Sequence, residues 1–134
     1  MNSFIELIRA HRSVRKFKKK PIPKRDLEMI LESCMRTSTA GNMQPYSIIV
    51  SKKTADKTRL CELHFDQEMV KSAPVLLTFC SDFHRMRRWI QLSNAPNNFD
   101  NLISYMIGAI DACLAAQTAA LAAESIGLGI CFLG

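Results

Sequence analysis

The stretch 102-LISYMIGAIDACLAAQTAALAAES-125 decides how this chain folds, because it is long, strongly apolar and carries only two charged residues, Asp111 and Glu124. Small residues recur in it every three or four positions: Gly108, Ala112, Ala115, Ala116, Ala119 and Ala123. A helix that is apolar nearly all round must be buried nearly all round, and small residues let a second helix approach closely. The sequence therefore predicts a long buried helix over about 102–125, and a subunit interface is one way in which its surface could be buried.

The same stretch has the length of a membrane span, and its composition separates the two interpretations. Residues 102–123 are rich in Ala, which contributes little to insertion, and they place Asp111 near the middle. A carboxylate at the centre of a membrane helix costs roughly 2.5–3.5 kcal/mol on insertion. We therefore expect a buried helix of a soluble protein and no membrane partner.

Composition predicts a single folded domain over residues 1–134. Of these 134 residues, 48 % are hydrophobic and 22 % are charged, which suits one compact core. The five cysteines are scattered, odd in number and without a CxxC pair, as in proteins of a reducing compartment. The first residues lack the basic-then-apolar order of a secretory signal, so a cytoplasmic location is expected.

The rest of the chain predicts helices and strands in alternation. A first helix is expected over about 3–10, and apolar residues at helical spacing predict a second from Leu27 to Met35. Residues 12–18 are expected to be extended or irregular. The later segments are predicted as a loop over 37–45, a strand over 46–52, a helix over 54–65, a strand over 74–82, a loop over 93–101 and a third strand over 130–133. Strands covered by helices indicate an α+β or α/β fold.

Positive charge is concentrated in one run of the sequence. The formal net charge is +6, and the six Lys and Arg residues from Arg12 to Lys20 equal that excess, so the remainder of the chain is neutral. A local patch indicates a discrete anionic ligand or an exposed edge. A nucleic-acid-binding module that uses Arg12–Lys20 and Arg85–Arg88 is one interpretation, although few aromatic residues stand beside these cations.

The order of residues in 11-HRSVR-15 is more specific than its charge. In an extended segment, alternate side chains point to opposite sides, so Ser13 lies with His11 and Arg15, while Arg12 points the other way. Guanidinium groups beside a hydroxyl suit a phosphate monoester, because Arg donates two parallel charge-assisted hydrogen bonds. These residues form a candidate phosphate site, and ordinary solvated charge is the alternative. Lys18–Lys20 are interpreted as solvated.

A second candidate site is 38-STAGNMQP-45, which is rich in hydroxyl and amide groups able to bind a heterocycle. An ordinary loop between a helix and a strand has the same composition, so both interpretations stay open. His11, His64 and His84 have no metal-ligand spacing, and the chain contains no GxSxG or HExxH. We therefore expect neither a metal site nor a catalytic side chain; if the protein is an enzyme, a cofactor carries the reaction.

The order of several motifs resembles the nitroreductase family of flavoenzymes. These motifs are RSVRKF at 12–17, NMQPYSIIV at 42–50, APVLLTFCSD at 73–82 and DACLAAQTAALAAESIGLGICFLG at 111–134. SDFHR at 81–85 and AAESIGLG at 122–129 favour the branch of NADPH-dependent flavin reductases and nitroreductases. The resemblance spans essentially the whole chain. Family members run well beyond 134 residues, so the C-terminal part of the family fold is expected to be missing.

The resemblance implies an α+β fold with a central, mostly antiparallel sheet covered by helices. It also implies a homodimer with one FMN at each of two interfaces, and the long alanine-rich helix in the dimer core. The residues that match the family's flavin-binding positions fall into three groups: His11, Arg12, Ser13 and Arg15 at the phosphate and ribityl chain; Ser38, Thr39, Asn42 and Gln44 reaching the flavin from the other subunit; and Phe132, Leu133 and Gly134 approaching the flavin.

The activity implied by the resemblance is a ping-pong oxidoreduction. NAD(P)H passes hydride to the flavin and leaves, and a nitroaromatic, a quinone or free flavin is then reduced in its place. The protein supplies positioning and shielding, and neither nucleic acid nor membrane takes part. Two alternatives stay open from the residues: a truncated, inactive relative that keeps the fold and dimerises, and the basic nucleic-acid-binding module.

Overall fold

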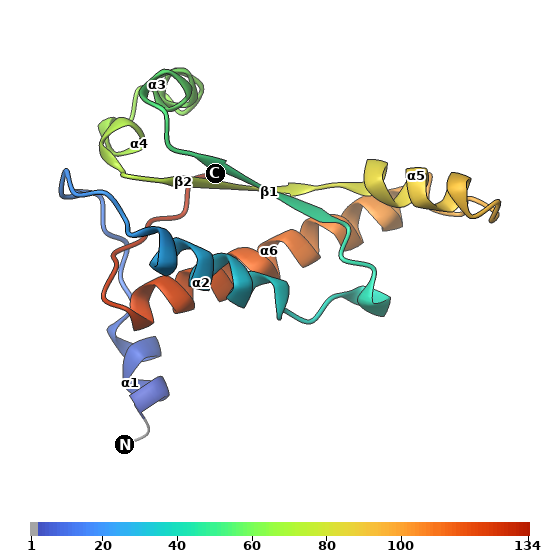
Figure 1. The fold of residues 1–134 in the computed structure, drawn as a ribbon, viewed down its shortest axis with the longest axis horizontal. Helices are drawn as coiled ribbons and strands as arrows, with labels where there is room; N and C mark the ends of the chain where they lie inside the picture. Colours follow the sequence, from blue (N-terminus) through green and yellow to red (C-terminus); the bar gives the residue numbers. More distant parts are fainter. Residues whose placement is uncertain (1–2) are drawn as a thin grey trace.

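Helix α6, Leu102–Ser125, is the element around which the rest of the chain is arranged. The computed structural model describes residues 3–134, and within them both strands and the helices α1, α2 and α5 contact α6. Figure 1 shows α6 running the length of the molecule, with α2 beside it and the two strands across it. The predicted helix over 102–125 is confirmed.

The other elements have the following bounds: α1 Ser3–Ala10, α2 Lys24–Met35, the 3-10 turn η1 Ala40–Asn42, β1 Tyr46–Ser51, α3 Thr54–Leu63, α4 Glu68–Ser72, β2 Leu76–Ser81 and α5 Phe83–Leu92. The predicted helices over 3–10 and 54–65 and the strands over 46–52 and 74–82 are confirmed with small differences at their ends. Helices α4 and α5 were not predicted.

Strands β1 and β2 form an antiparallel pair that makes the fold α+β. Their register runs from Tyr46 opposite Ser81 to Ser51 opposite Leu76. Helices α3 and α4 connect the strands at one end of this pair, and α5 follows β2 at the other end (Figure 1). One face of the pair packs on α6.

The predicted third strand over 130–133 is wrong. Among the described residues, this segment makes one isolated parallel bridge, between Ser13 and Ile130, and the amide of Val14 donates to the Ile130 carbonyl at 2.8 Å. A run of apolar residues becomes a strand only where a neighbouring backbone pairs along its length. Here the neighbour pairs at one residue only, so the segment stays irregular.

Small side chains on α6 let α2 and β1 pack closely against it. Ile30, Cys34 and Tyr46 are buried against a stripe of alanines, which are Ala112, Ala115, Ala119 and Ala123. Gly108 belongs to the same face, since a Cβ atom there would lie 2.3 Å from Ser81 Oγ and 3.1 Å from the Pro45 carbonyl oxygen. The predicted role of small residues, close approach of other elements, is confirmed.

The opposite face of α6 is apolar and exposed, contrary to the expectation that the helix is buried nearly all round. Its large side chains are between 46 % and 71 % exposed: Leu102, Ile103, Tyr105, Met106, Ile110 and Leu114. By length and composition, α6 is the one helix among the described residues that resembles a membrane span, and 39 % of its most apolar window is buried. Core helices of soluble proteins have the same length and composition.

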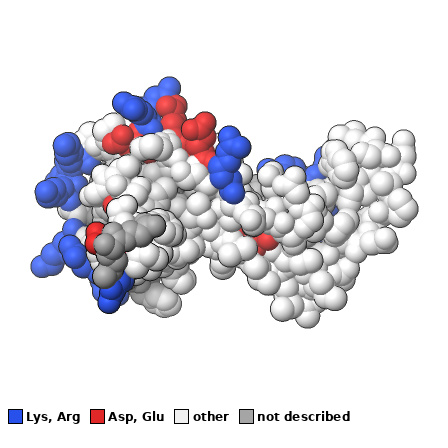
Figure 2. Space-filling model, turned by 90° about the horizontal axis from the view of Figure 1, so that it is seen from below, with Lys and Arg blue, Asp and Glu red and all other residues white. Residues whose placement is uncertain are grey.

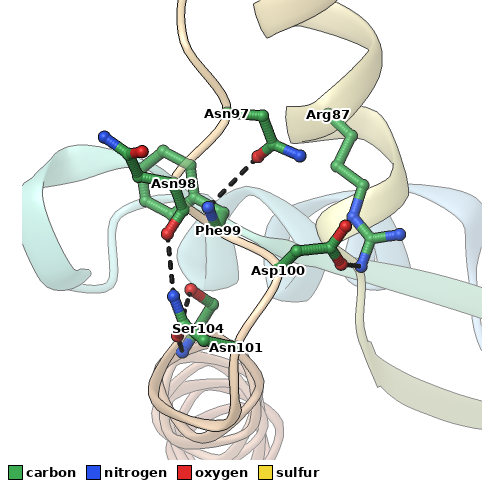
Figure 3. Close-up of polar contacts among 7 residues, drawn as sticks. All are labelled: Arg87, Asn97, Asn98, Phe99, Asp100, Asn101 and Ser104. Carbon is green, nitrogen blue, oxygen red and sulfur yellow. Dashed lines mark hydrogen bonds and ion pairs between the residues drawn. The ribbon is translucent and has the colours of Figure 1, made fainter.

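The connection between α5 and α6 is an ordered loop, as predicted for 93–101 (Figure 3). The Asn101 side chain caps α6, because its Oδ1 accepts from the Ser104 amide at 2.9 Å, while its Nδ2 donates to the Asn98 carbonyl at 2.8 Å. Asparagine is among the preferred residues at this helix position. The start of α6 is therefore fixed by its own loop.

The same loop attaches α5 to the start of α6. Arg87 of α5 forms an ion pair with Asp100 (Figure 3), and the ring of Phe99 stacks on Phe83 with 5.8 Å between ring centroids. Asn97 Oδ1 accepts from the Phe99 amide at 3.1 Å and shapes the turn. These contacts hold α5 in place, and α5 in turn supports part of the candidate site.

Candidate functional site

The segment His11–Arg15, named the basic segment, runs along the C-terminal end of α6. Nδ1 of His11 lies 2.9 Å from Oε1 of Glu124, near the end of that helix. Val14 is half-buried, while His11, Arg12, Ser13 and Arg15 are exposed. Within residues 3–134, neither Arg12 nor Arg15 pairs with a carboxylate, so both guanidinium groups remain available to an anion.

Gly129 allows the C-terminal segment to lie against the basic segment. A Cβ atom at Gly129 would come within 2.9 Å of the Val14 Cβ atom, which is closer than side chains tolerate. The chain continues from this contact through Ile130 to Phe132, whose side chain is 53 % exposed, and to Gly134. The structure thus brings Gly129 and Ile130 against the basic segment, while Phe132 and Leu133 continue into the groove between β2 and α6.

Positive charge is unevenly distributed on the face seen in Figure 2. On this face most Lys and Arg side chains lie towards the end that holds α1 and the basic segment, and the opposite end is largely uncharged. Helix α5, at that opposite end, carries three exposed arginines, Arg85, Arg87 and Arg88, so the basic segment is one of two cationic regions.

Residues 38–44, named the polar loop, lie towards the other end of α6 and have an unusual backbone. Gly41, Asn42 and Gln44 all have φ between 52° and 56°, in the left-handed region. Asn adopts this conformation more readily than most residues, but two non-glycine residues there within three positions store strain of about 1–3 kcal/mol each. Such a shape persists only when neighbouring groups hold it.

Three contacts hold the polar loop. The Ala40 amide donates to the carboxylate of Asp111 on α6, with 3.2 and 3.3 Å to its two oxygens. The Arg85 guanidinium on α5 donates to the Tyr46 carbonyl at 3.1 Å and also to the Gln44 carbonyl. The Asp82 amide donates to the Pro45 carbonyl at 2.8 Å.

The sequence did not reveal Asp111 and Arg85 as site residues. Asp111 served only as an argument against a membrane span, although a lone carboxylate in an apolar helix must find a donor when buried. Arg85 stood among several basic residues and was not distinguishable from them. The lone carboxylate of Asp111 in an apolar helix was therefore the one feature of the sequence that could have indicated this contact.

The polar loop borders a cavity of about 410 Å³ that α5 closes from the other side. Asn42 and Gln44 line it together with Arg85 and the exposed Trp89. Next to it, Oγ1 of Thr39 is buried and has no hydrogen-bond partner among the described residues. An unpaired buried hydroxyl is costly by about 1–3 kcal/mol, so this loop has an unmet hydrogen-bonding group.

The titratable groups around the polar loop form hydrogen bonds that stabilise the fold. Ser47 Oγ donates to Asp82, and this bond, more than any other factor, lowers the pKa of the Asp82 carboxyl. Burial raises the pKa of the Cys34 thiol and of the Tyr46 hydroxyl, and the Tyr46 hydroxyl donates to the Cys34 carbonyl at 3.2 Å. A thiol with a raised pKa is a poor nucleophile.

The basic segment and the polar loop are far apart within one chain. Their contacts on α6, Glu124 and Asp111, are thirteen residues apart, and at the rise of an α-helix this is about 20 Å. Between β2 and α6 lies an apolar groove of about 840 Å³, and Phe17 and Phe132 are among the residues that line it. Among residues 3–134, no three His, Cys, Asp or Glu side chains group as metal ligands do.

The fold and the site define an α+β protein in which one long helix supports a cationic segment and a rigid polar loop. The chain belongs to the nitroreductase family: the model of the "Nitroreductase family" matches residues 8–134. The resemblance inferred from the motifs is thereby confirmed.

Individual relatives agree with this membership. An FMN reductase (NADPH) of Bacillus subtilis is 34 % identical over 136 residues, which cover 100 % of this chain and 55 % of that protein. The structure of B. megaterium NfrA1 has a TM-score of 0.95 and 38 % identity, covering 99 % of this chain and 55 % of that one.

A third relative was solved with a ligand. The NADPH:FMN oxidoreductase from Vibrio harveyi complexed with NAD+ has a TM-score of 0.87 and 34 % identity, covering 96 % of this chain and 54 % of that one. The present chain thus spans about half the length of the relatives it matches.

Proposed function

We propose that this protein is an FMN-dependent NAD(P)H oxidoreductase that works as a homodimer. Family membership and relatives named FMN reductase (NADPH) and NADPH:FMN oxidoreductase support the activity and the cofactor. The single observation that carries the dimer is the separation of about 20 Å between the two groups of candidate residues along α6. The basic segment of one subunit and the polar loop of the other would together hold each FMN.

Pairing of two α6 helices closes this distance. If the exposed faces of α6 pack in antiparallel fashion about a two-fold axis, the C-terminal end of one helix meets the N-terminal half of the other. The basic segment at one end then lies beside the partner's polar loop. One symmetric interface therefore completes two equal flavin sites.

The distribution of apolar surface supports the same pairing. The exposed side chains of α6 cluster in its N-terminal half, whereas α1 precedes the basic segment at the other end of α6 and exposes Phe4, Ile5 and Ile8 by 44–52 %. In an antiparallel pair, each α6 start would be covered by α1 of the partner subunit. Both exposed apolar surfaces would then be buried by the same contact.

The exposed area also supports a large interface. The chain exposes 9546 Å², whereas a compact monomer of 15.1 kDa exposes roughly 7,100 Å². The excess is roughly 2,400 Å². It is the surface that a partner subunit and the remaining length of the family fold, which the relatives carry beyond the matched half, can cover between them.

The donor groups fit FMN in chemical type. Arg12 and Arg15, with Ser13 between them, suit the phosphate, and His11 belongs to the same segment. Amide and hydroxyl groups of the polar loop, which are those of Ser38, Thr39, Asn42 and Gln44, suit the heterocycle. Phe132 and Leu133 line the apolar groove. When bound, FMN supplies the hydride and electron transfer that these side chains cannot perform.

The remaining parts of the proposal concern substrates, domains and location. Nitroaromatics, quinones or free flavin are the electron acceptors, and residues 1–134 act as one domain. The proposal includes no nucleic acid, since the relatives are named for the reduction of flavin. Five free thiols favour the cytoplasm, and Asp111 turned into the fold favours α6 as an interface helix over a membrane span.

The test is to purify the chain, add FMN and measure flavin absorbance, flavin stoichiometry and subunit number. The proposal expects a dimer with one FMN per subunit that oxidises NADPH in the presence of a quinone. A chain that takes up no FMN contradicts the proposal. Full flavin occupancy without NADPH oxidation identifies the inactive relative, and salt-dependent binding to DNA that FMN does not affect identifies the nucleic-acid module.

An Ile110→Asp variant tests the interface separately. Ile110 is 55 % exposed on the apolar face of α6, and a carboxylate there would be buried unpaired in the dimer. We expect a monomer with weak FMN binding. Ile49→Asp, the same substitution at an equally exposed position on β1, outside α6, serves as the control and should remain dimeric.

A further inference from the structure

We propose that Asp111 is a positioning residue: its carboxylate fixes the polar loop in the shape that meets the flavin. This inference rests on the proposed function, and it concerns a residue that touches the loop and not the flavin. Asp111 acts through the Ala40 amide, and Arg85 of α5 fixes the other end of the same loop.

The burial of Asp111 is the first observation. Its side chain is 2 % exposed in the middle of an apolar helix, and Ala40 provides the one hydrogen-bond donor that the described residues give this carboxylate. A buried carboxylate with one donor is a poor source of stability, because desolvation outweighs a single hydrogen bond. An alanine would suit the packing of this helix better. We therefore infer that the Asp111 carboxylate determines the position of the polar loop.

The conformation of the loop is the second observation. Ala40 is the first residue of η1, and the two residues after it, Gly41 and Asn42, lie in the left-handed region. Gln44 lies there as well, so the chain would relax if its ends were released. Asp111 holds the start of this strained stretch, and Arg85 holds the Gln44 carbonyl at its end.

The place of Asp111 on α6 is the third observation. Its neighbour Ile110 and the next exposed residue on that face, Leu114, belong to the apolar surface proposed as the subunit interface. One helix turn therefore carries both the contact to the partner and the contact to the loop. The loop is thus fixed relative to the interface across which it must reach the partner's flavin.

The decisive variant removes the donor and leaves α6 untouched. Ala40→Pro deletes the amide hydrogen, and the backbone accepts proline, because Ala40 is the first residue of its helical turn and Thr39 before it is extended with φ −132° and ψ 155°. The proline Cδ atom takes the place of that hydrogen, so the variant also pushes the loop away from the Asp111 carboxylate. On α6, Asp111→Leu removes the acceptor and keeps the branch at Cγ in a larger side chain, whereas Asp111→Asn keeps both the size and an oxygen that can accept from Ala40. Ser104→Ala is the control, since Ser104 is a buried polar residue on the same helix that bonds only within its own loop.

Two measurements are made on each dimeric variant: FMN affinity, and the visible circular dichroism of the bound flavin. The amide exchange of Ala40 is added in the variants that retain this hydrogen. For Ala40→Pro and Asp111→Leu we expect the dichroism of the bound flavin to change and FMN affinity to fall about tenfold. A tenfold fall is within the range for the loss of one charge-assisted hydrogen bond. Ala40 should exchange at least about tenfold faster in Asp111→Leu. Asp111→Asn should restore most of each signal, and Ser104→Ala should match the original protein.

The variants also separate this inference from the proposed function. The double variant Ala40→Pro with Asp111→Leu should weaken FMN binding no more than either change alone, because both remove the same bond. Unchanged FMN affinity and dichroism in Ala40→Pro overturns the inference, even if the exchange of Ala40 responds to Asp111. If the original protein binds no FMN, the proposed function fails, while the amide exchange still reports whether Asp111 holds the loop.

Discussion

The basic segment and the polar loop differ in how the fold holds them. The basic segment is exposed, and a single backbone hydrogen bond from Val14 to Ile130 and the contact of His11 with Glu124 attach it to the end of α6. The polar loop has a strained backbone, and a buried carboxylate and a guanidinium group fix both of its ends. The basic segment is charged and has few contacts with the rest of the fold. The polar loop has no charged side chain and is held at both ends.

This difference indicates a division of work between the two regions. A cationic segment attracts an anion over a distance and tolerates movement, because Coulomb attraction falls off gradually. Hydrogen bonds from a loop to a flat heterocycle require fixed positions and directions. Variants of the basic segment should therefore change affinity in a salt-dependent way, and variants around the loop should change geometry.

The largest effect is expected from Gly129→Val, which breaks the attachment of the basic segment. Its Cβ atom would lie 2.9 Å from the Val14 Cβ atom, and that atom is fixed to the backbone, so the two segments must separate. We expect a loss of about 3 kcal/mol in the free energy of unfolding, at the upper end for overpacking. Urea denaturation measures it, and amide exchange should accelerate at Val14 but not at Ala40. Equal acceleration at both amides would contradict the separation of the two regions.

The next effect is the loss of FMN affinity in Arg12→Ala and in Arg15→Ala. Each change should weaken FMN binding by about 1.5–3 kcal/mol, the range for a hydrogen bond to a charged group. Titration at several salt concentrations measures it, and the salt dependence should fall together with the affinity. Lys19→Ala, a change in the same run outside the proposed contact, should leave FMN affinity unchanged. If both Arg variants bind FMN as the original protein does, the phosphate site lies elsewhere.

The sequence predicts a region well when the interactions that form it join residues close together in the chain, and poorly when they join distant residues. The order of residues in 11–15 and the small residues of 102–125 are local patterns, and both the exposed cations and the bounds of α6 agree with them. The bond from Ala40 to Asp111 joins positions 71 residues apart, and no local pattern reports it. Residue types thus predict the basic segment, whereas the geometry of the polar loop required the fold.

Other differences have local physical reasons. Helix α5 was interpreted as a basic cluster, although Phe83 and Ile90 are seven residues apart on one buried face and Asp82 caps the helix by accepting from the Arg85 amide. The third strand failed because strand formation depends on a partner edge, which the segment itself cannot encode. The exposed face of α6 was predicted to be covered, and within one chain it is not.

A smaller effect is expected from Gly108→Ala, which disturbs the polar loop and leaves the basic segment in place. The new Cβ atom would lie 2.3 Å from Ser81 Oγ, which can rotate, and 3.1 Å from the Pro45 carbonyl, which follows directly after the loop. We expect a loss of about 1–2 kcal/mol in the free energy of unfolding. Exchange should accelerate at Ala40 and not at Val14, the reverse of the Gly129→Val pattern, and acceleration at both amides would show that the two regions are coupled.

The smallest effect concerns Asp82, which caps the helix that holds the polar loop. A hydrogen bond from Ser47 lowers the pKa of Asp82 below its ordinary value of 3.8, so Asp82 stabilises the fold above that pH and loses its contribution as the pH falls through the lowered value. Asp82→Asn should therefore reduce the free energy of unfolding at pH 6 by less than about 1 kcal/mol, as for exposed charged groups. The difference between variant and original protein should shrink as the pH falls below 3.8.

Ser47→Ala separates the effect of the hydrogen bond from that of the helix cap. It removes the first cause of the lowered pKa and leaves the carboxylate at the start of α5, so part of the acid sensitivity should remain. Thermal unfolding between pH 3 and pH 6 measures both variants. Because Arg85 on the same helix holds the Gln44 carbonyl, the protection factor for amide exchange near Gln44, which corrects for the intrinsic pH dependence of exchange, should fall with acid in the original protein and stay constant in Asp82→Asn. A difference between Asp82→Asn and the original protein that grows towards low pH would show that Asp82 does not stabilise α5 as a carboxylate, and the support of the polar loop would then rest on Asp111 and Arg85 alone.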